Sequence, residues 1–224
     1  MRFAQTVSSH AKELSIKGLS HFRRQFINDK NVTIISNNCW AGWVYRRYGL
    51  MYQTPTIGLY FFARDYIEFC KQLDHYIGEK LEFISANESK YFQNIVERKQ
   101  QSVPIGLLGG KVEIVFLHYQ NEKEAYEKWN RRLERIRSDN LVFKFSEMDL
   151  CTPQIVEEFD QLPYKKKVCF TANSYPQLAS SVPILKVLEG DRVANDTTYY
   201  ADYIDLTRFL NTGEIVRKKA SQRG

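Results

Sequence analysis

The chain of 224 residues lacks the sequence signals that identify the most common chemistries. Its four cysteines lie far apart with no Cys-x-x-Cys pair, so neither a disulfide framework nor a zinc site is expected. A Gly-x-Gly-x-x-Gly fingerprint, a Walker motif and a Gly-x-Ser-x-Gly elbow are all missing. Because helix-turn-helix, zinc-finger and RNA-recognition signatures are missing too, no nucleic-acid partner is expected.

Long apolar runs and internal repeats are also absent. Residues 1–25 have no apolar core long enough for a secretion signal, and no later run approaches the length of a membrane span. Free thiols are typical of a reducing compartment, so the expected location is the cytoplasm. The sequence indicates no metal and no particular cofactor, and it leaves the oligomeric state open.

The composition that is present is that of an aromatic-rich globular protein. Hydrophobic residues make up 43% of the chain and aromatic residues 14%, enough for a substantial core. Lys and Arg number 32 against 26 Asp and Glu, a formal charge of +6. This excess favours anionic partners, such as a phosphorylated ligand or the inner face of a membrane, although ordinary soluble proteins carry a similar spread-out charge.

Short β-branched segments alternate with helical segments along most of the chain. Strands are expected at 32–35, 56–62, 112–117, 141–145 and 168–171, and helices at 40–48, 65–77, 121–137, 152–159 and 205–211. This alternation predicts a single α/β domain over residues 1–224, with three layers and a mostly parallel sheet covered by helices on both faces. A turn is expected at Gly106–Gly110, and residues 79–103 fit either a polar, partly helical segment or an insertion.

The two ends of the chain are basic. Residues 1–30 are expected to hold a basic helical segment, with its helix over 10–27, and residues 212–224 a frayed basic tail. Such a helix either lies on an anionic membrane or packs on the domain. Peripheral membrane association therefore remains open.

The strand-to-helix turn Ser36-Asn37-Asn38-Cys39-Trp40-Ala41-Gly42 is the most informative segment. In an open α/β sheet, ligands bind beyond the carboxyl ends of the strands. Cys39 would lie at a helix N-terminus, where free N–H groups favour a thiolate or hold a phosphate or an oxyanion. The candidate substrate-binding residues of the turn are Ser36, Asn37, Asn38 and Gly42.

Other polar residues are expected at the same edge of the sheet. His118 follows the strand at 112–117 and is the candidate base for a Cys39 nucleophile. Glu147 and Asp149 follow the next strand, and Asn173, a further candidate binding residue, follows the last. The alternative is structural: Cys39 is a small buried residue, the asparagines close the turn, and His118 has no chemical role.

The helix that starts at Asn121 carries a row of basic residues beside its apolar stripe. Lys128, Arg131, Arg132 and Arg135 fall at i, i+3, i+4 and i+7 and so share one face. Guanidinium groups suit phosphate or pyrophosphate, which makes the three arginines candidate donor-binding residues. A solvated face paired with neighbouring glutamates is the alternative.

Several segments together resemble a known family. They are Ser36-Asn37-Asn38-Cys39-x-Ala41-Gly42, Gly49-Leu50-x-Tyr52-x-Thr54-Pro55-Thr56-Ile57-Gly58-Leu59, Asp65-Tyr66-Ile67-x-Phe69-Cys70, His118-Tyr119 with Lys128-Trp129-Asn130-Arg131-Arg132, and Phe159-Asp160-x-Leu162-Pro163. This set resembles the bacterial domain of unknown function 1919, often labelled an exopolysaccharide or capsule biosynthesis protein. The resemblance implies a role in surface polysaccharide assembly, where donors such as nucleotide sugars, lipid-linked sugars and coenzyme A esters are anionic.

Two hypotheses of different classes follow. The first is a cytoplasmic transferase that modifies a saccharide, with an anionic small-molecule or saccharide donor bound by the turn at 37–42 and by Arg131, Arg132 and Arg135. The second is a non-catalytic binding or assembly protein of the polysaccharide machinery. A thiol hydrolase would differ from the transferase only in its acceptor, and the sequence does not separate the two.

Overall fold

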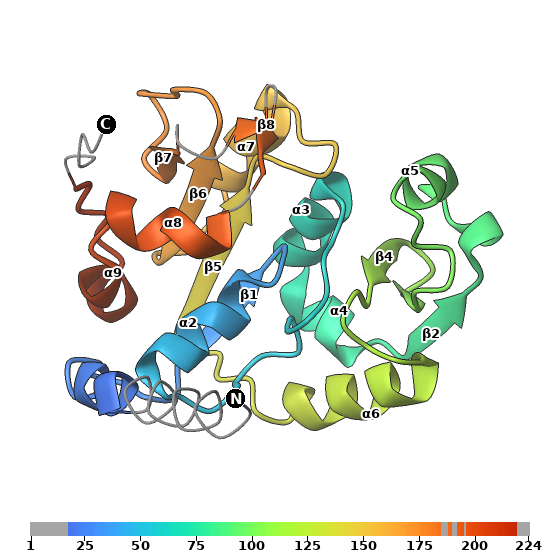
Figure 1. Cartoon of the computed structure of the whole chain (residues 1–224), viewed down its shortest axis with the longest axis horizontal. Helices are drawn as coiled ribbons and strands as arrows, with labels where there is room; N and C mark the ends of the chain where they lie inside the picture. The colour runs from blue at the N-terminus through green and yellow to red at the C-terminus, as the bar shows by residue number, and fades with distance from the viewer. Residues whose placement is uncertain (1–17, 185–187, 190–191, 195, 219–224) are drawn as a thin grey trace, which may run out of the picture.

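A parallel sheet of four strands, in the order β1-β5-β6-β7, forms one half of the computed structural model (Figure 1). The structure describes residues 18–184, 188–189, 192–194 and 196–218. The strands are β1 (Thr33–Ser36), β5 (Leu141–Ser146), β6 (Lys167–Thr171) and β7 (Ser181–Pro183). Thr33 pairs with Leu141 and Phe143 with Lys167, and every pairing in this sheet is parallel. All four carboxyl ends therefore meet at one edge.

Helices cover both faces of this sheet, which confirms the predicted architecture. One face packs against α2 (Trp40–Tyr48), α8 (Asp196–Tyr203) and α9 (Leu206–Thr212), and the other against α3 (Ala63–Lys71) and α7 (Pro153–Asp160). Alternation along β5 explains the arrangement, since Val142 joins the first cluster and Phe143 and Phe145 join the second.

An antiparallel sheet of three strands lies beside the parallel one, to its right in Figure 1. It consists of β2 (Leu81–Ile84), β3 (Ile105–Leu108) and β4 (Val112–Val115). The other helices are α4 (Leu73–Gly78), the short η1 (Ala86–Glu88), α5 (Phe92–Glu97) and α6 (Glu122–Leu133). A small hairpin, β8 (Leu188–Glu189) and β9 (Arg192–Val193), lies near the carboxyl edge.

This second sheet corrects three expectations. The segment 56–62 is not a strand, because among its residues only Tyr60 forms a β-bridge, to Val115. The strand at 112–115 does not join the parallel sheet. Gly106 lies in strand β3 and not in a turn. At this position in the strand a Cβ would come within 2.6 Å of the Leu81 side chain. The turn itself is formed by Gly109 and Gly110, both with positive φ.

Helix boundaries follow local signals in most places. Gly49 ends α2 in the left-handed conformation (φ 59°), and the Asn121 side chain accepts the backbone N–H of Glu124 at 2.9 Å at the start of α6, in agreement with the helices expected at 40–48 and from 121. Asp65 is a correction, since α3 begins at Ala63 and the buried Asp65 carboxylate accepts the backbone N–H of Glu113 at 2.7 Å. Asp65 thus ties α3 to the antiparallel sheet.

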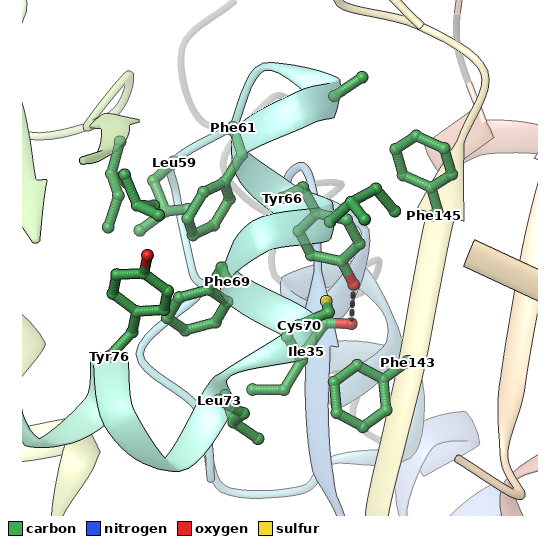
Figure 2. Close-up of a cluster of buried hydrophobic side chains, with 14 of the residues drawn as sticks. Ile35, Leu59, Phe61, Tyr66, Phe69, Cys70, Leu73, Tyr76, Phe143 and Phe145 are labelled. Carbon is green, nitrogen blue, oxygen red and sulfur yellow. Dashed lines mark hydrogen bonds between the residues drawn. The ribbon is translucent and has the colours of Figure 1, made fainter. Parts of the chain in front are cut away.

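The larger core fills the space between the two sheets and is rich in aromatic rings (Figure 2). The Tyr66 hydroxyl donates to the carbonyls of Ile35 and Lys144, at 2.9 and 2.8 Å, and its ring stacks on Phe145. Phe61 and Phe69 pack with centroids 5.2 Å apart, and Cys70 is buried in the same cluster. Burial of each such ring stabilises the fold by roughly 1.5–3 kcal/mol.

The ends of the described chain pack against the first face of the sheet. Residues 18–24 are helical, and the earlier part of the helix expected at 10–27 lies outside the described residues. After α9 the chain turns back, and the carbonyl of Val216 accepts the backbone N–H of Asp205, at the start of α9, at 3.0 Å. The tail is described as far as Lys218, and residues 219–224 lie outside the described residues. Within the described ranges, no helix combines the length and apolar character needed to span a membrane.

Candidate functional site

Two adjoining cavities of about 340 and 400 Å³ form a groove at the carboxyl edge of the parallel sheet, here called the edge groove. The first contains Asn38, Cys39, Tyr60, Gln100, Asp196 and Thr197 among its lining residues, and the second Asn94, Glu97 and Arg192. Arg98 and Asp149 line both cavities. The edge groove thus lies where open α/β sheets bind ligands, with one wall supplied by the antiparallel half of the molecule.

A fully buried lysine lies beneath the edge groove. Lys144 points from β5 toward the α2 side of the sheet, and its side chain is 0% exposed. Its ammonium donates to Asn38 Oδ1 at 2.8 Å and Asn37 Oδ1 at 3.3 Å, and it forms an ion pair with Asp196 of α8. Burial lowers the pKa of Lys144, while the Asp196 carboxylate opposes that shift.

The Asp196 carboxylate is also fully paired. Asn38 Nδ2 donates to both of its oxygens, at 3.0 and 3.1 Å, and Ser146 Oγ donates at 2.5 Å. These contacts attach the first turn of α8 to the ends of β1 and β5. Burying two charges costs desolvation energy that their attraction often only balances, so such a network does not by itself indicate added stability. Networks of this kind also occur at functional sites.

The turn after β1 is held by its own side chains. Asn38 Oδ1 accepts the backbone N–H of Trp40 at 3.1 Å, which satisfies a free donor at the start of α2. Ser36 Oγ donates to the carbonyl of Asn38 at 2.7 Å and accepts the backbone N–H of Ala41 at 3.3 Å. Ser36 and Asn37 are fully buried, so of these three polar side chains only Asn38 lines the edge groove.

An arginine–carboxylate pair crosses the middle of the edge groove. Arg98, at the end of α5, donates from Nη1 to Asp149 Oδ1 at 2.8 Å, and its guanidinium lies 5.4 Å from the Tyr60 ring centre. Burial raises the pKa of Asp149, and Arg98 opposes the shift. The Tyr60 hydroxyl donates to Gln100 Oε1 at 2.7 Å on the same wall. Asp149 therefore places in the edge groove a carboxyl group whose pKa is raised.

Backbone strain is concentrated at the same place. Among the described residues other than glycine, only Lys99, Asp149 and Leu150 have positive φ, at 56°, 54° and 65°. Asp149 is the carboxylate of the pair, and Lys99 and Leu150 directly follow its two members in the chain. Such conformations cost of order 1–3 kcal/mol each and gather at binding and catalytic sites.

Cys39 and His118 are not brought together as a catalytic pair. Cys39 lines the edge groove with its sulfur 4.0 Å from the carbonyl oxygen of Leu59, and burial raises the pKa of its thiol. His118 is exposed, and its backbone N–H donates to Gly58 at 2.9 Å. No hydrogen bond joins the two side chains within the described part of the chain. β4 belongs to the antiparallel sheet; Leu117, which follows it, lines the edge groove together with Cys39, whereas the next residue, His118, is exposed.

The other predicted site residues lie outside the linings of the edge groove. Asn173 is exposed and donates from Nδ2 to Glu147 Oε1 at 3.3 Å, while Gly42 is buried against Ile57. Arg132 is buried and donates to the Tyr119 hydroxyl at 2.6 Å. Arg135 donates to the carbonyl of Tyr52 at 3.4 Å, and Arg131 is exposed. The helix that carries these arginines leads into the amino end of β5, away from the carboxyl edge.

Four charged residues of the site were not among the sequence candidates. Lys144 could have been noticed in the sequence, because it is a lysine in the middle of the apolar strand Leu-Val-Phe-Lys-Phe-Ser. Asp149 was expected at this edge of the sheet, where it does lie, but without a chemical role. Arg98 lies in the ambiguous segment 79–103, and Asp196 follows no recognisable motif.

Comparison with known proteins gives a family and no activity. A family model described as a domain of unknown function (DUF1919) matches residues 10–213. A Haemophilus influenzae protein described as uncharacterized is 29% identical over 193 residues, which cover 83% of this chain and 86% of that relative. Neither description mentions polysaccharide, a substrate or a reaction.

Proposed function

This chain belongs to the family of domains of unknown function DUF1919, and from its edge groove we propose that it is a cytoplasmic saccharide-modifying transferase of bacterial surface polysaccharide biosynthesis. The reaction is the transfer of a group from an anionic donor to a saccharide hydroxyl. One observation carries the proposal: the Arg98–Asp149 pair lies in strained backbone at the centre of a groove at the carboxyl edge of the sheet.

Asp149 takes the role of general base. A carboxyl group whose pKa is raised by burial is a better proton acceptor than an exposed aspartate. The hydroxyl oxygen of the acceptor attacks the transferred group and gives its proton to Asp149. The bond between that group and the donor breaks, and the electron pair leaves with the donor's anionic portion.

Arg98 binds that anionic portion. Its guanidinium presents donors in a planar fork, which suits a phosphate, and it already faces the cavity that Asp149 lines. An anion bound to Arg98 competes with the Arg98–Asp149 bond and so frees the carboxylate for proton transfer. Gln100 lines the first cavity, where its side-chain amide is the polar group offered to the hydroxyls of a saccharide.

Cys39 has a lining role in this proposal. Its raised pKa keeps the sulfur protonated at neutral pH, and no base is hydrogen-bonded to it within the described residues. The chemistry therefore rests on Asp149, and the thiol hydrolase loses support.

A thermal-shift screen of nucleotide sugars and coenzyme A esters tests the proposal. A donor that binds the folded state raises its melting temperature by mass action. We expect Arg98→Gln to weaken binding of the donor by about tenfold or more, since hydrogen bonds to charged groups contribute about 1.5–3 kcal/mol. Asp149→Asn should keep donor binding but slow transfer to a saccharide by about 10²–10⁴-fold. Arg208→Gln, which removes an exposed guanidinium paired with Glu214 outside the groove linings, is the matched control.

Two results would contradict the transferase. If no donor shifts the melting temperature, the non-catalytic binding or assembly protein becomes the better hypothesis. If Asp149→Asn transfers at the rate of the unaltered protein, Asp149 is not the base. Cys39→Ala should leave both binding and transfer unchanged.

A further inference from the structure

Helix residues 18–24 and the turn that follows present an apolar face to solvent. Leu19, Phe22 and Phe26 are 49%, 58% and 53% exposed, and their spacing places them on one side of the segment. The Phe22 and Phe26 rings pack edge to face with centroids 5.1 Å apart. We call these three residues the amino-terminal apolar face. Large apolar side chains gathered in this way mark an interaction surface.

The segment is held to the protein through its other side. Arg24 donates from Nη1 to the carbonyl of Gly49 at 3.3 Å, at the end of α2. Asn211 of α9 donates from Nδ2 to the carbonyl of Phe26 at 2.8 Å and accepts the backbone N–H of Asn28 at 3.0 Å. Ile27 is buried among α2 and α9 side chains. The outward direction of the three apolar side chains is therefore fixed by anchored backbone.

The surroundings of this face are basic. Between residues 18 and 64 the only acidic residue is Asp29, whereas Arg23 lies on the segment and Arg46 on α2, whose C-terminal Gly49 the segment contacts. Neither Arg23 nor Arg46 forms an ion pair with a carboxylate in the part of the chain that the structure describes. On α2, Trp43 is 47% exposed and carries the Arg46 guanidinium over its ring at 4.2 Å.

We propose that the amino-terminal apolar face, with its flanking arginines, docks on an anionic membrane surface. Apolar side chains enter the boundary between headgroups and acyl chains, and the arginines attract anionic lipid. Charge favours lipid over a second copy of this chain. In a symmetric dimer the same patch meets itself, so two sets of unpaired arginines would face each other.

Docking here leaves the edge groove open. Residues 27–32 lead from the apolar face into the amino end of β1, while the edge groove lies beyond its carboxyl end. Membrane binding therefore does not depend on the transferase proposal, and either can fail without the other.

Vesicle flotation of the full-length chain tests the surface, with phosphatidylcholine vesicles that contain or lack phosphatidylglycerol. The unaltered protein should float only with the anionic vesicles and lose binding as salt is raised. Phe22→Ser combined with Phe26→Ser should weaken partitioning by at least about tenfold. Arg23→Gln combined with Arg46→Gln should weaken it by about fivefold for each arginine removed.

Phe92→Ser is the matched control, because Phe92 of α5 is a ring 43% exposed on another part of the molecule. It should bind vesicles like the unaltered protein, and all variants should keep the unaltered melting temperature. Equal binding to neutral and anionic vesicles, absence of binding, or unchanged binding of both double variants would overturn the proposal. The proposal would also be overturned if light scattering showed that the unaltered protein is a dimer and does not bind vesicles, while the double phenylalanine variant is a monomer.

Discussion

Removing one partner of the buried Lys144–Asp196 ion pair should destabilise the protein more than removing both. Both side chains are almost completely inaccessible, at 0% and 1% exposure, so neither charge can be rehydrated without opening the fold. An uncompensated buried charge costs about 3–5 kcal/mol. Since small proteins unfold with about 5–15 kcal/mol, either single change removes a large share of the stability.

The Asp196→Asn variant should also acquire a pH dependence. Its unpaired ammonium has a pKa further below that of the unfolded chain, so the unfolded state binds more protons and stability rises with pH. Lys144→Met instead leaves the Asp196 carboxylate buried without its cation, and its loss of stability is measured at pH 7.

Combining Lys144→Met with Asp196→Asn should cost about 1–3 kcal/mol with no pH slope from this pair. That remaining cost arises because the amide oxygens of Asn37 and Asn38, which accept from Lys144 at 3.3 and 2.8 Å, lose their donor. Guanidinium chloride unfolding at pH 5, 7 and 9, followed by tryptophan fluorescence, measures each free energy. The exposed Lys80→Met is the matched control and should leave the midpoint unchanged. Single variants that cost under about 1 kcal/mol, or an Asp196→Asn stability that does not rise with pH, would refute the reasoning.

Three further predictions concern other buried groups. Tyr66→Phe removes the hydroxyl that donates to two buried carbonyls, and denaturant unfolding should show a loss of about 1–3 kcal/mol. Arg98→Gln should raise the pKa of Asp149 further, because in the unaltered protein the Arg98 guanidinium counteracts the rise that burial causes. Stability from an acid with a raised pKa is complete below its unfolded pKa and lost as pH rises through its folded pKa. The free energy of unfolding of Arg98→Gln should therefore fall more steeply than that of the unaltered protein above about pH 4. Cys39, whose pKa is raised by burial, should react with iodoacetamide at pH 7 more slowly in the folded than in the unfolded chain, as followed by mass spectrometry.

Each of these has its own contrary result. Equal midpoints for Tyr66→Phe and the unaltered protein would mean that the two carbonyls find other donors. An Arg98→Gln variant with an unchanged pH slope would separate Arg98 from the titration of Asp149, and adding Asp149→Asn should abolish the difference. Labelling of Cys39 at the same rate in folded and unfolded protein would show that burial does not suppress its ionisation.

Elements with strong local signals were predicted well from the sequence. The strand at 33–36, its turn, α2 and the Gly49 end follow in order, and Asn121 and Pro153 mark the starts of α6 and α7. These features depend on backbone geometry and on hydrogen bonds within a few residues, so the sequence carries them directly. The segment 56–62 was predicted wrongly because an apolar run indicates burial without indicating strand pairing.

The charged partners could not be predicted in the same way. Arg98 and Asp149 are 51 positions apart, and Asn38 and Asp196 are 158 apart. Arg98 also comes from the segment 79–103, whose elements are short and whose strand β2 pairs with a later strand. Periodicity shows which faces turn inward, but it does not show which inward polar groups meet.

The sequence by itself determined the parallel α/β frame and the position of the turn at 36–42 on its carboxyl edge. Hydrophobic alternation and turn chemistry are sufficient for both, because each acts within one element. The tertiary structure alone decided that the turn meets Lys144 and Asp196 and lies beside the Arg98–Asp149 pair. A buried charge is stable only beside a partner, and that partner is set by how distant elements pack around the same core.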